Sequence, residues 1–77
     1  MKVNKYRFGK NIYDRLQEKG KNSVWLSNET DAHETSISNY INGKVLPNAV
    51  NFYKIARALD ITMDALMEGV VKDDEIS

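Results

Sequence analysis

The residues best suited to recognise another molecule are short polar side chains gathered between positions 34 and 39. They are Glu34, Thr35, Ser36, Ser38 and Asn39. Hydroxyl and carboxamide groups donate and accept hydrogen bonds, and proteins use both on DNA base edges and phosphates. Ser, Thr and Asn have low helix propensity, so a helix that is merely solvated would more often carry Lys, Glu or Gln. The composition favours a recognition surface over the alternative, an ordinary polar face.

Patterns that would indicate catalysis or metal binding are missing from the sequence. The chain has no cysteine and one histidine, His33, so neither a disulfide nor a thiolate metal site can form. No glycine-rich phosphate loop occurs, and no nucleophile lies in a motif with a histidine or acidic partner. We therefore expect no enzymatic activity, no metal, no cofactor and no small-molecule ligand.

Helical periodicity dominates the sequence and predicts an all-α fold. Apolar residues recur every four positions at Phe8, Ile12 and Leu16, which gives the first helix one apolar stripe. Capping residues and apolar spacing predict five helices, at about residues 5–19, 23–30, 34–42, 49–59 and 63–68. The whole chain, 1–77, is expected to form a single domain, with residues 69–77 as a short acidic tail.

The second and third predicted helices are separated only by residues 31–33. So short a connection forces a sharp angle between them, as in the helix-turn-helix unit, whose second helix enters the major groove of DNA. Any two helices joined by a tight turn satisfy this description, so the pattern is weak on its own. The polar row between positions 34 and 39 is the stronger observation, because it falls on the second helix of the pair.

Charge is unevenly distributed, although the net charge is zero. Residues 1–30 contain seven Lys or Arg and three acidic residues, a balance of +4, whereas residues 31–77 contain four and eight, a balance of −4. Such asymmetry can present a basic face to phosphate, although small surfaces are also uneven by chance. No apolar run reaches the roughly 18 residues of a membrane span, and no signal-peptide core follows the basic N-terminus. A soluble, cytoplasmic protein is therefore expected.

Beyond these patterns, the sequence resembles the lambda-repressor-like, Cro/CI-type (Xre) family of helix-turn-helix domains over about residues 8–68. The matching blocks follow the family pattern in order and spacing without a gap. They are Phe8-Gly9, Ile12, Glu18-Lys19-Gly20, Ile37 to Lys44, Pro47, Lys54 to Ile61 and Asp64-Ala65-Leu66. The resemblance implies a compact five-helix domain whose second and third helices form a helix-turn-helix that binds DNA.

The resemblance and the residues flanking the helix pair assign candidate DNA contacts. The base-reading positions of the family fall on Glu34, Thr35, Ser38 and Asn39. The expected contacts to the DNA backbone are Lys21, Asn22, Ser23, His33, Ser36, Asn42 and Lys44. Glu34 is an awkward occupant, because a carboxylate repels phosphates, although it can accept a hydrogen bond from a cytosine amino group. His33 stands at a capping position, where a cap or a phosphate contact is favoured over the alternative, a pH switch.

Three features of the sequence depart from the family pattern. Asp31 occupies the turn where relatives have Gly, and Asp tolerates the left-handed conformation better than most residues. Relatives pair an Arg late in the first helix with a Glu late in the third, but here these positions are Leu16 and Ile41. An apolar contact is therefore expected in place of an ion pair. The loop at Val45-Leu46 also lacks the basic residues that relatives often carry there.

The aromatic residues outside the expected core have no assigned role. Trp25 is expected to lean across the first helix and to be partly buried, although its position is often polar in relatives. The alternative is a contact of its ring with a DNA sugar or with a partner. Tyr6, Tyr13 and Tyr53 are expected to be half-buried at the edge of the core.

Together, the residues and the resemblance predict a sequence-specific regulator of transcription that binds double-stranded DNA and acts as a repressor. Because one recognition helix covers only a few base pairs, a weak homodimer is expected. Its candidate interface residues are Leu46, Val70 and Val71, apolar positions outside the expected core. The alternative is a protein-interaction module, an antirepressor or antitoxin with the same fold, and the zero net charge is compatible with it.

Overall fold

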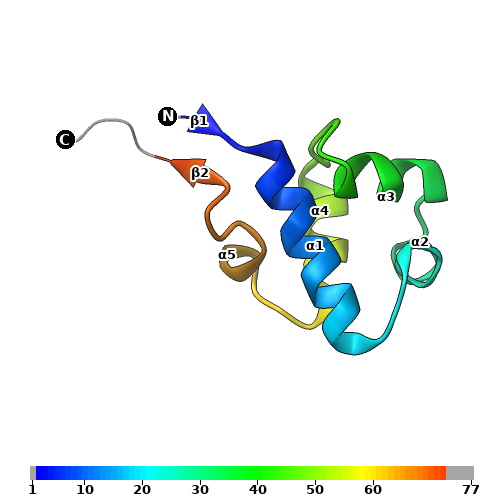
Figure 1. The fold of residues 1–77 in the computed structure, drawn as a ribbon. Coiled ribbons are helices and arrows are strands. Elements are labelled where there is room, and N and C mark those ends of the chain that lie inside the picture. Colours follow the sequence, from blue (N-terminus) through cyan, green and yellow to red (C-terminus); the bar gives the residue numbers. More distant parts are fainter. Residues whose placement is uncertain (1, 73–77) are drawn as a thin grey trace.

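The computed structural model describes residues 2–72, which form a helical body with a short strand pair at one side (Figure 1). Within these residues the helices are α1 (Lys5–Lys19), α2 (Ser23–Thr30), α3 (Glu34–Ile41), α4 (Ala49–Leu59) and α5 (Met63–Leu66). The strands are β1 (Lys2–Val3) and β2 (Val71–Lys72), and they pair antiparallel. The predicted all-helical architecture of five helices is confirmed for this part of the chain. None of these helices is long and apolar enough to cross a membrane.

Side-chain caps define where most of the helices begin. The residue preceding α1, α2, α4 and α5 accepts a hydrogen bond from the backbone N–H three positions later, which satisfies a group that the helix leaves without a partner. These caps are Asn4, Asn22, Asn48 and Thr62. α3 is different, because His33 stands at its cap position without a side-chain cap hydrogen bond. The capping role considered for His33 is therefore not formed.

The turn between α2 and α3 depends on the backbone conformation of Asp31. Asp31 has a φ of 57° and lies in the left-handed region, as its place in the sequence predicted. Its backbone N–H donates to the Ser27 carbonyl, which closes the end of α2. The chain then reaches α3 within two residues, so the two short helices are held at an angle to one another (Figure 1).

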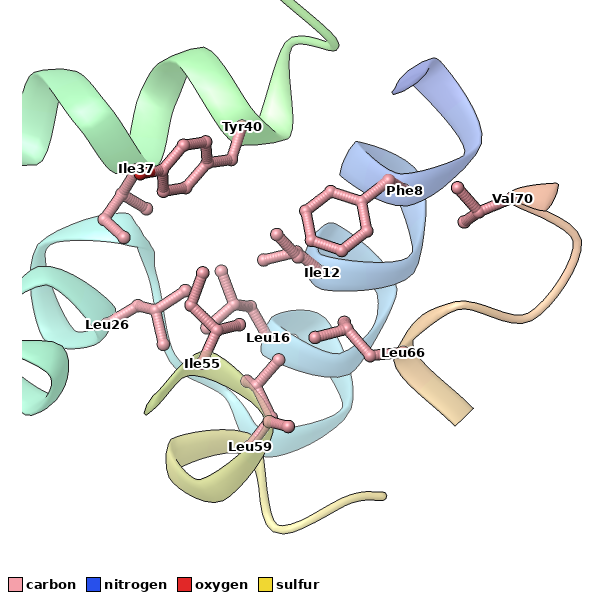
Figure 2. Close-up of a cluster of buried hydrophobic side chains, with 11 residues drawn as sticks. Phe8, Ile12, Leu16, Leu26, Ile37, Tyr40, Ile55, Leu59, Leu66 and Val70 are labelled. Carbon is pink, nitrogen blue, oxygen red and sulfur yellow. The ribbon is translucent and has the colours of Figure 1, made fainter. Parts of the chain in front are cut away.

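The core forms where α1 meets the other helices (Figure 2). Phe8, Ile12 and Leu16, the predicted stripe of α1, are all buried. Around them lie buried residues from α2 to α5 and from the segment before β2: Leu26, Ile37, Tyr40, Ile55, Ala56, Leu59, Leu66 and Val70. The Phe8 ring also meets the Phe52 ring edge-on, with 5.8 Å between centroids. Burial of this apolar surface is what holds the short helices in place.

The segment after α5 departs from the sequence expectation. α5 ends at Leu66 rather than at residue 68, and α3 ends at Ile41 with Asn42 as its C-cap. Residues 69–72 are not a tail, because Val70 is fully buried and the next two residues form β2. The remainder of the expected acidic tail, residues 73–77, lies outside the described residues.

Hydrogen bonds between the two ends of the described chain explain this ordering. The Asn4 backbone N–H donates to the Val70 carbonyl at 2.7 Å. The Asn11 side chain donates to the carbonyls of Leu66 and Glu68, both at 2.9 Å. Because these bonds satisfy the backbone of the segment, it can bury Val70 without leaving polar groups unpaired. Val70 therefore belongs to the core, and its assignment to a dimer interface is wrong.

Candidate nucleic-acid interface

The polar row on α3 faces away from the core. Ile37 and Tyr40 are buried on the inner side of the helix, and this fixes its rotation. Glu34, Thr35 and Ser38 are exposed, whereas Ser36 and Asn39 are half-buried. The structure thus exposes three of the four positions that the sequence assigned to base contacts, and partly covers the fourth, Asn39.

A shallow hollow joins the start of α2 to the exposed face of α3. Its volume is about 420 Å³, and it is lined by Ser23, Val24, Glu34, Thr35 and Ser38. Four of these five residues were assigned to DNA contacts from the sequence, and Val24 was not. The short turn after Asp31 is what brings residues from the two helices to one surface.

A second hollow, of about 250 Å³, lies next to the first and shares Ser23 and Ser38 with it. Its lining residues come from α1, the start of α2 and the end of α3: Tyr13, Leu16, Gln17, Lys21, Asn22, Ser23, Ser38, Ile41 and Asn42. Leu16 and Ile41 both border it, and half-buried Ile41 packs against the core cluster that contains Leu16. Apolar side chains therefore stand where relatives are expected to carry an Arg and a Glu.

Some of the polar side chains on this surface already form hydrogen bonds with other groups of the protein. The Asn42 side-chain amide donates to the Ser38 hydroxyl at 3.2 Å, which orients both side chains. The Asn22 carboxamide oxygen accepts from the Trp25 backbone N–H at 2.9 Å. The amide group of Asn22 and the hydroxyl hydrogen of Ser38 can still donate to an acceptor such as a phosphate oxygen.

Lys21 and Trp25 form a contact that the sequence reasoning missed. The Lys21 ammonium lies 5.6 Å from the centroid of the Trp25 ring, within cation–π range. Trp25 is half-buried and packs against the core, as expected, while Lys21 is exposed. The only signal in the sequence was their spacing of four residues across the start of α2.

Lys44 and His33 lie outside the two hollows, at opposite ends of α3. Lys44 is exposed and follows Gly43, and its backbone N–H donates to the Asn39 carbonyl at 2.9 Å. His33 is exposed at the start of the helix. The two residues therefore border the polar face rather than contribute to its centre.

Carboxylates reduce the positive charge of α1. Lys10 lies 3.4 Å from Asp14, and Arg15 lies 3.5 Å from Glu18, each on the same helix. These exposed pairs contribute little to stability but lower the local potential. The +4 balance of residues 1–30 already counts these two carboxylates, and the cations outside the two pairs are Lys2, Lys5, Arg7, Lys19 and Lys21.

Comparison with known proteins agrees with this geometry. The sequence profile of the helix-turn-helix domain family matches residues 9–71, so the chain belongs to that family, a class of DNA-binding domains used in transcription regulation. The fold is also similar to the crystal structure of the restriction-modification controller protein C.AhdI from Aeromonas hydrophila. The two share 24% sequence identity with a TM-score of 0.77, over 80% of this chain and 94% of the other. No curated protein matches the chain.

Proposed function

We propose that the protein is a sequence-specific regulator of transcription that reads the major groove of double-stranded DNA with α3. The exposed polar face of α3, joined to the start of α2 by a turn of fixed geometry, is the observation that carries this proposal. The major groove accepts one α-helix, and short polar side chains let its backbone approach the bases closely. The structural relative is described as a controller protein, which supports a regulatory role.

Base reading is assigned to Thr35 and Asn39, supported by Glu34 and Ser38. Thr35 and Asn39 are one helical turn apart, so they lie on the same side of α3. An Asn side chain can form two hydrogen bonds with adenine, and a Thr methyl can contact thymine. Glu34 can accept from a cytosine amino group, and it lowers affinity for DNA that offers no such donor.

Backbone contacts are assigned to residues on both sides of the reading face. Lys21, Asn22 and Ser23 lie at the start of α2, and Asn42 and Lys44 lie beyond the end of α3. We assign His33 and Ser36, at the start of α3, to the same role. Phosphate contacts of this kind fix the register and orientation of a protein on the duplex but carry no base information.

A weak homodimer on DNA is the expected assembly, because one reading helix covers few base pairs and two half-sites lie about 34 Å apart. Leu46 and Val71 remain candidates for its interface, with 38% and 39% of their surface exposed. Occupancy of an operator by such a dimer would exclude other proteins from the same groove, so repression is the simplest mode of control.

Selection of binding sites from random duplexes tests the proposal directly. We expect enrichment of a palindromic sequence, bound with an affinity that falls steeply as salt is added, because phosphate contacts release counterions. Sedimentation of the selected complex should give two chains per duplex. Absence of enrichment, with weak retention on duplex DNA that hardly depends on salt, would favour the protein-interaction alternative instead.

A further inference from the structure

Tyr6 is a large side chain on the surface with no role in the core. Its exposed fraction is 74%, so the half-buried position expected for it is wrong. Tyr13 and Tyr53 are each 50% exposed, which agrees with the half-buried positions expected for them. The sequence profile of the family begins at residue 9, so Tyr6 lies in a part of the chain that this profile does not cover.

One edge of the Tyr6 ring contacts the backbone at Gly43, just after α3. A Cβ atom placed on Gly43 would lie 2.5 Å from Cδ1 and 3.0 Å from Cε1 of Tyr6, so the ring covers the position that any other residue would fill. Gly43 also has a φ of 73°, which favours glycine. Figure 1 shows the start of α1 beside the loop that leaves α3. Tyr6 is therefore adjacent to the residues assigned to backbone contacts at that end, Asn42 and Lys44.

Two lysines line a hollow that Tyr6 also lines. Tyr6 forms one wall of a hollow of about 370 Å³ at the side of the strand pair, and this hollow is also lined by Lys2 and Lys5. Lys44 is the residue after Gly43, which the Tyr6 ring contacts. An anionic group is the partner that such an environment favours. A Tyr side chain has few rotatable bonds, so it loses little conformational entropy on binding.

From these contacts we propose that the Tyr6 hydroxyl donates a hydrogen bond to a DNA phosphate just outside the groove segment read by α3. The proposal rests on the proposed function, because it extends the same interface by one contact beyond Lys44. The hydroxyl of Tyr is a good donor to a charged oxygen, and such bonds are stronger than neutral ones. The contact positions the duplex without reading its sequence.

The test compares Tyr6→Phe with the wild-type protein on the selected duplex. We expect Tyr6→Phe to weaken binding about tenfold, equally on all sequences, as for loss of a hydrogen bond to a charged group. The salt dependence should stay unchanged, because no ionic contact is removed. Tyr53→Phe is the matched control, since Tyr53 is exposed on α4 and its hydroxyl accepts from Arg57 at 2.9 Å.

A neutral methylphosphonate at each flanking phosphate in turn locates the contact. At one phosphate the substitution should weaken wild-type binding but leave Tyr6→Phe nearly unaffected. Equal binding of Tyr6→Phe and wild type would overturn the proposal. If in addition Tyr6→Ala lost binding, the ring would act only by packing on Gly43. A change in the number of chains per duplex in Tyr6→Phe would assign the ring to contact with a second copy. If wild-type protein binds no duplex, the proposed function itself fails.

Discussion

Gly9 of α1 lies directly against the Ile41 carbonyl group at the end of α3. A Cβ atom on Gly9 would also lie 2.6 Å from the Ile41 carbonyl carbon, and these are backbone atoms that cannot rotate away. The close approach lets α1 support α3 at the end that precedes Asn42. The position of α3 relative to α1 therefore depends on the absence of a methyl group at Gly9.

Gly9→Ala should destabilise the protein by roughly 1–3 kcal/mol, as expected for overpacking of a close contact. This loss would outweigh the roughly 0.5–1 kcal/mol that Ala normally gains over Gly within a helix. Urea unfolding followed by circular dichroism measures the change. Gln17→Ala, at an exposed position of α1, is the control and should stay within about 0.5 kcal/mol of the wild type. A Gly9→Ala variant as stable as the wild type would show that α3 can move away.

Asn39→Ala should cost roughly 1–3 kcal/mol of binding free energy on the preferred duplex and relax the preference at one base pair. Lys44→Ala should instead weaken binding about equally on all sequences and reduce the salt slope by about one unit. Fluorescence anisotropy on a panel of single-base variants separates the two. Intact affinity and preference in Asn39→Ala would mean that α3 is not the reading helix as placed. An unchanged salt slope in Lys44→Ala would remove only its phosphate contact.

Leu16→Arg and Ile41→Glu should each be strongly destabilising, by up to about 3–5 kcal/mol, because each places a charge without a partner at the edge of the core. The double variant should recover a large part of this loss, since both residues border the same hollow of about 250 Å³, which leaves room for the longer side chains. A double-mutant cycle on unfolding free energies measures the coupling. Additive losses would show that the two new side chains do not meet.

Val70→Ala should destabilise the fold by roughly 1.5–3 kcal/mol, because Val70 is fully buried and its truncation leaves a cavity. Val71→Ala is the matched control, since Val71 is 39% exposed, and its effect should stay within about 0.5 kcal/mol. Thermal unfolding of the two variants makes the comparison. Equal, small effects would mean that the segment after α5 contributes no core packing.

Trp25, the only tryptophan in the sequence, should report DNA binding through its fluorescence. If Lys21 moves from the ring to a phosphate, the emission of Trp25 should change on addition of the selected duplex. In Lys21→Met most of this change should be lost, while stability should fall by less than about 1 kcal/mol, the usual strength of an exposed cation–π contact. An equal change in both proteins would assign it to another part of the interface.

The parts of the fold that could be predicted were those that repeat along the sequence. The spacing of Phe8, Ile12 and Leu16 extends over more than two turns, so it fixes both the helix and its buried face. β1 and β2 have two residues each, which is too short for any alternation to show. Their pairing depends on hydrogen bonds between opposite ends of the described chain, and such long-range contacts cannot be predicted from local sequence patterns.

Periodicity also decided which residues of the candidate interface could be predicted from the sequence. Residues on one exposed helix face follow from periodicity, so Thr35 and Ser38 could be placed before the structure was known. The contacts of Tyr6 with Gly43 and of Lys21 with Trp25 could not be predicted, because each joins a residue of a helix to a residue of a loop. The partial burial of Asn39 likewise depends on the fold around α3 rather than on its spacing.

Because Lys2 pairs with Lys72, the first and last described residues of the chain lie side by side. The chain leaves and returns at one corner of the molecule, on the side opposite α2 (Figure 1). A domain or tag fused close to either of these residues would therefore lie at the same corner, away from the polar face shared by α2 and α3. A short linker from one strand to the other would make the chain circular. It would stabilise the fold mainly by reducing the conformational entropy of the unfolded chain.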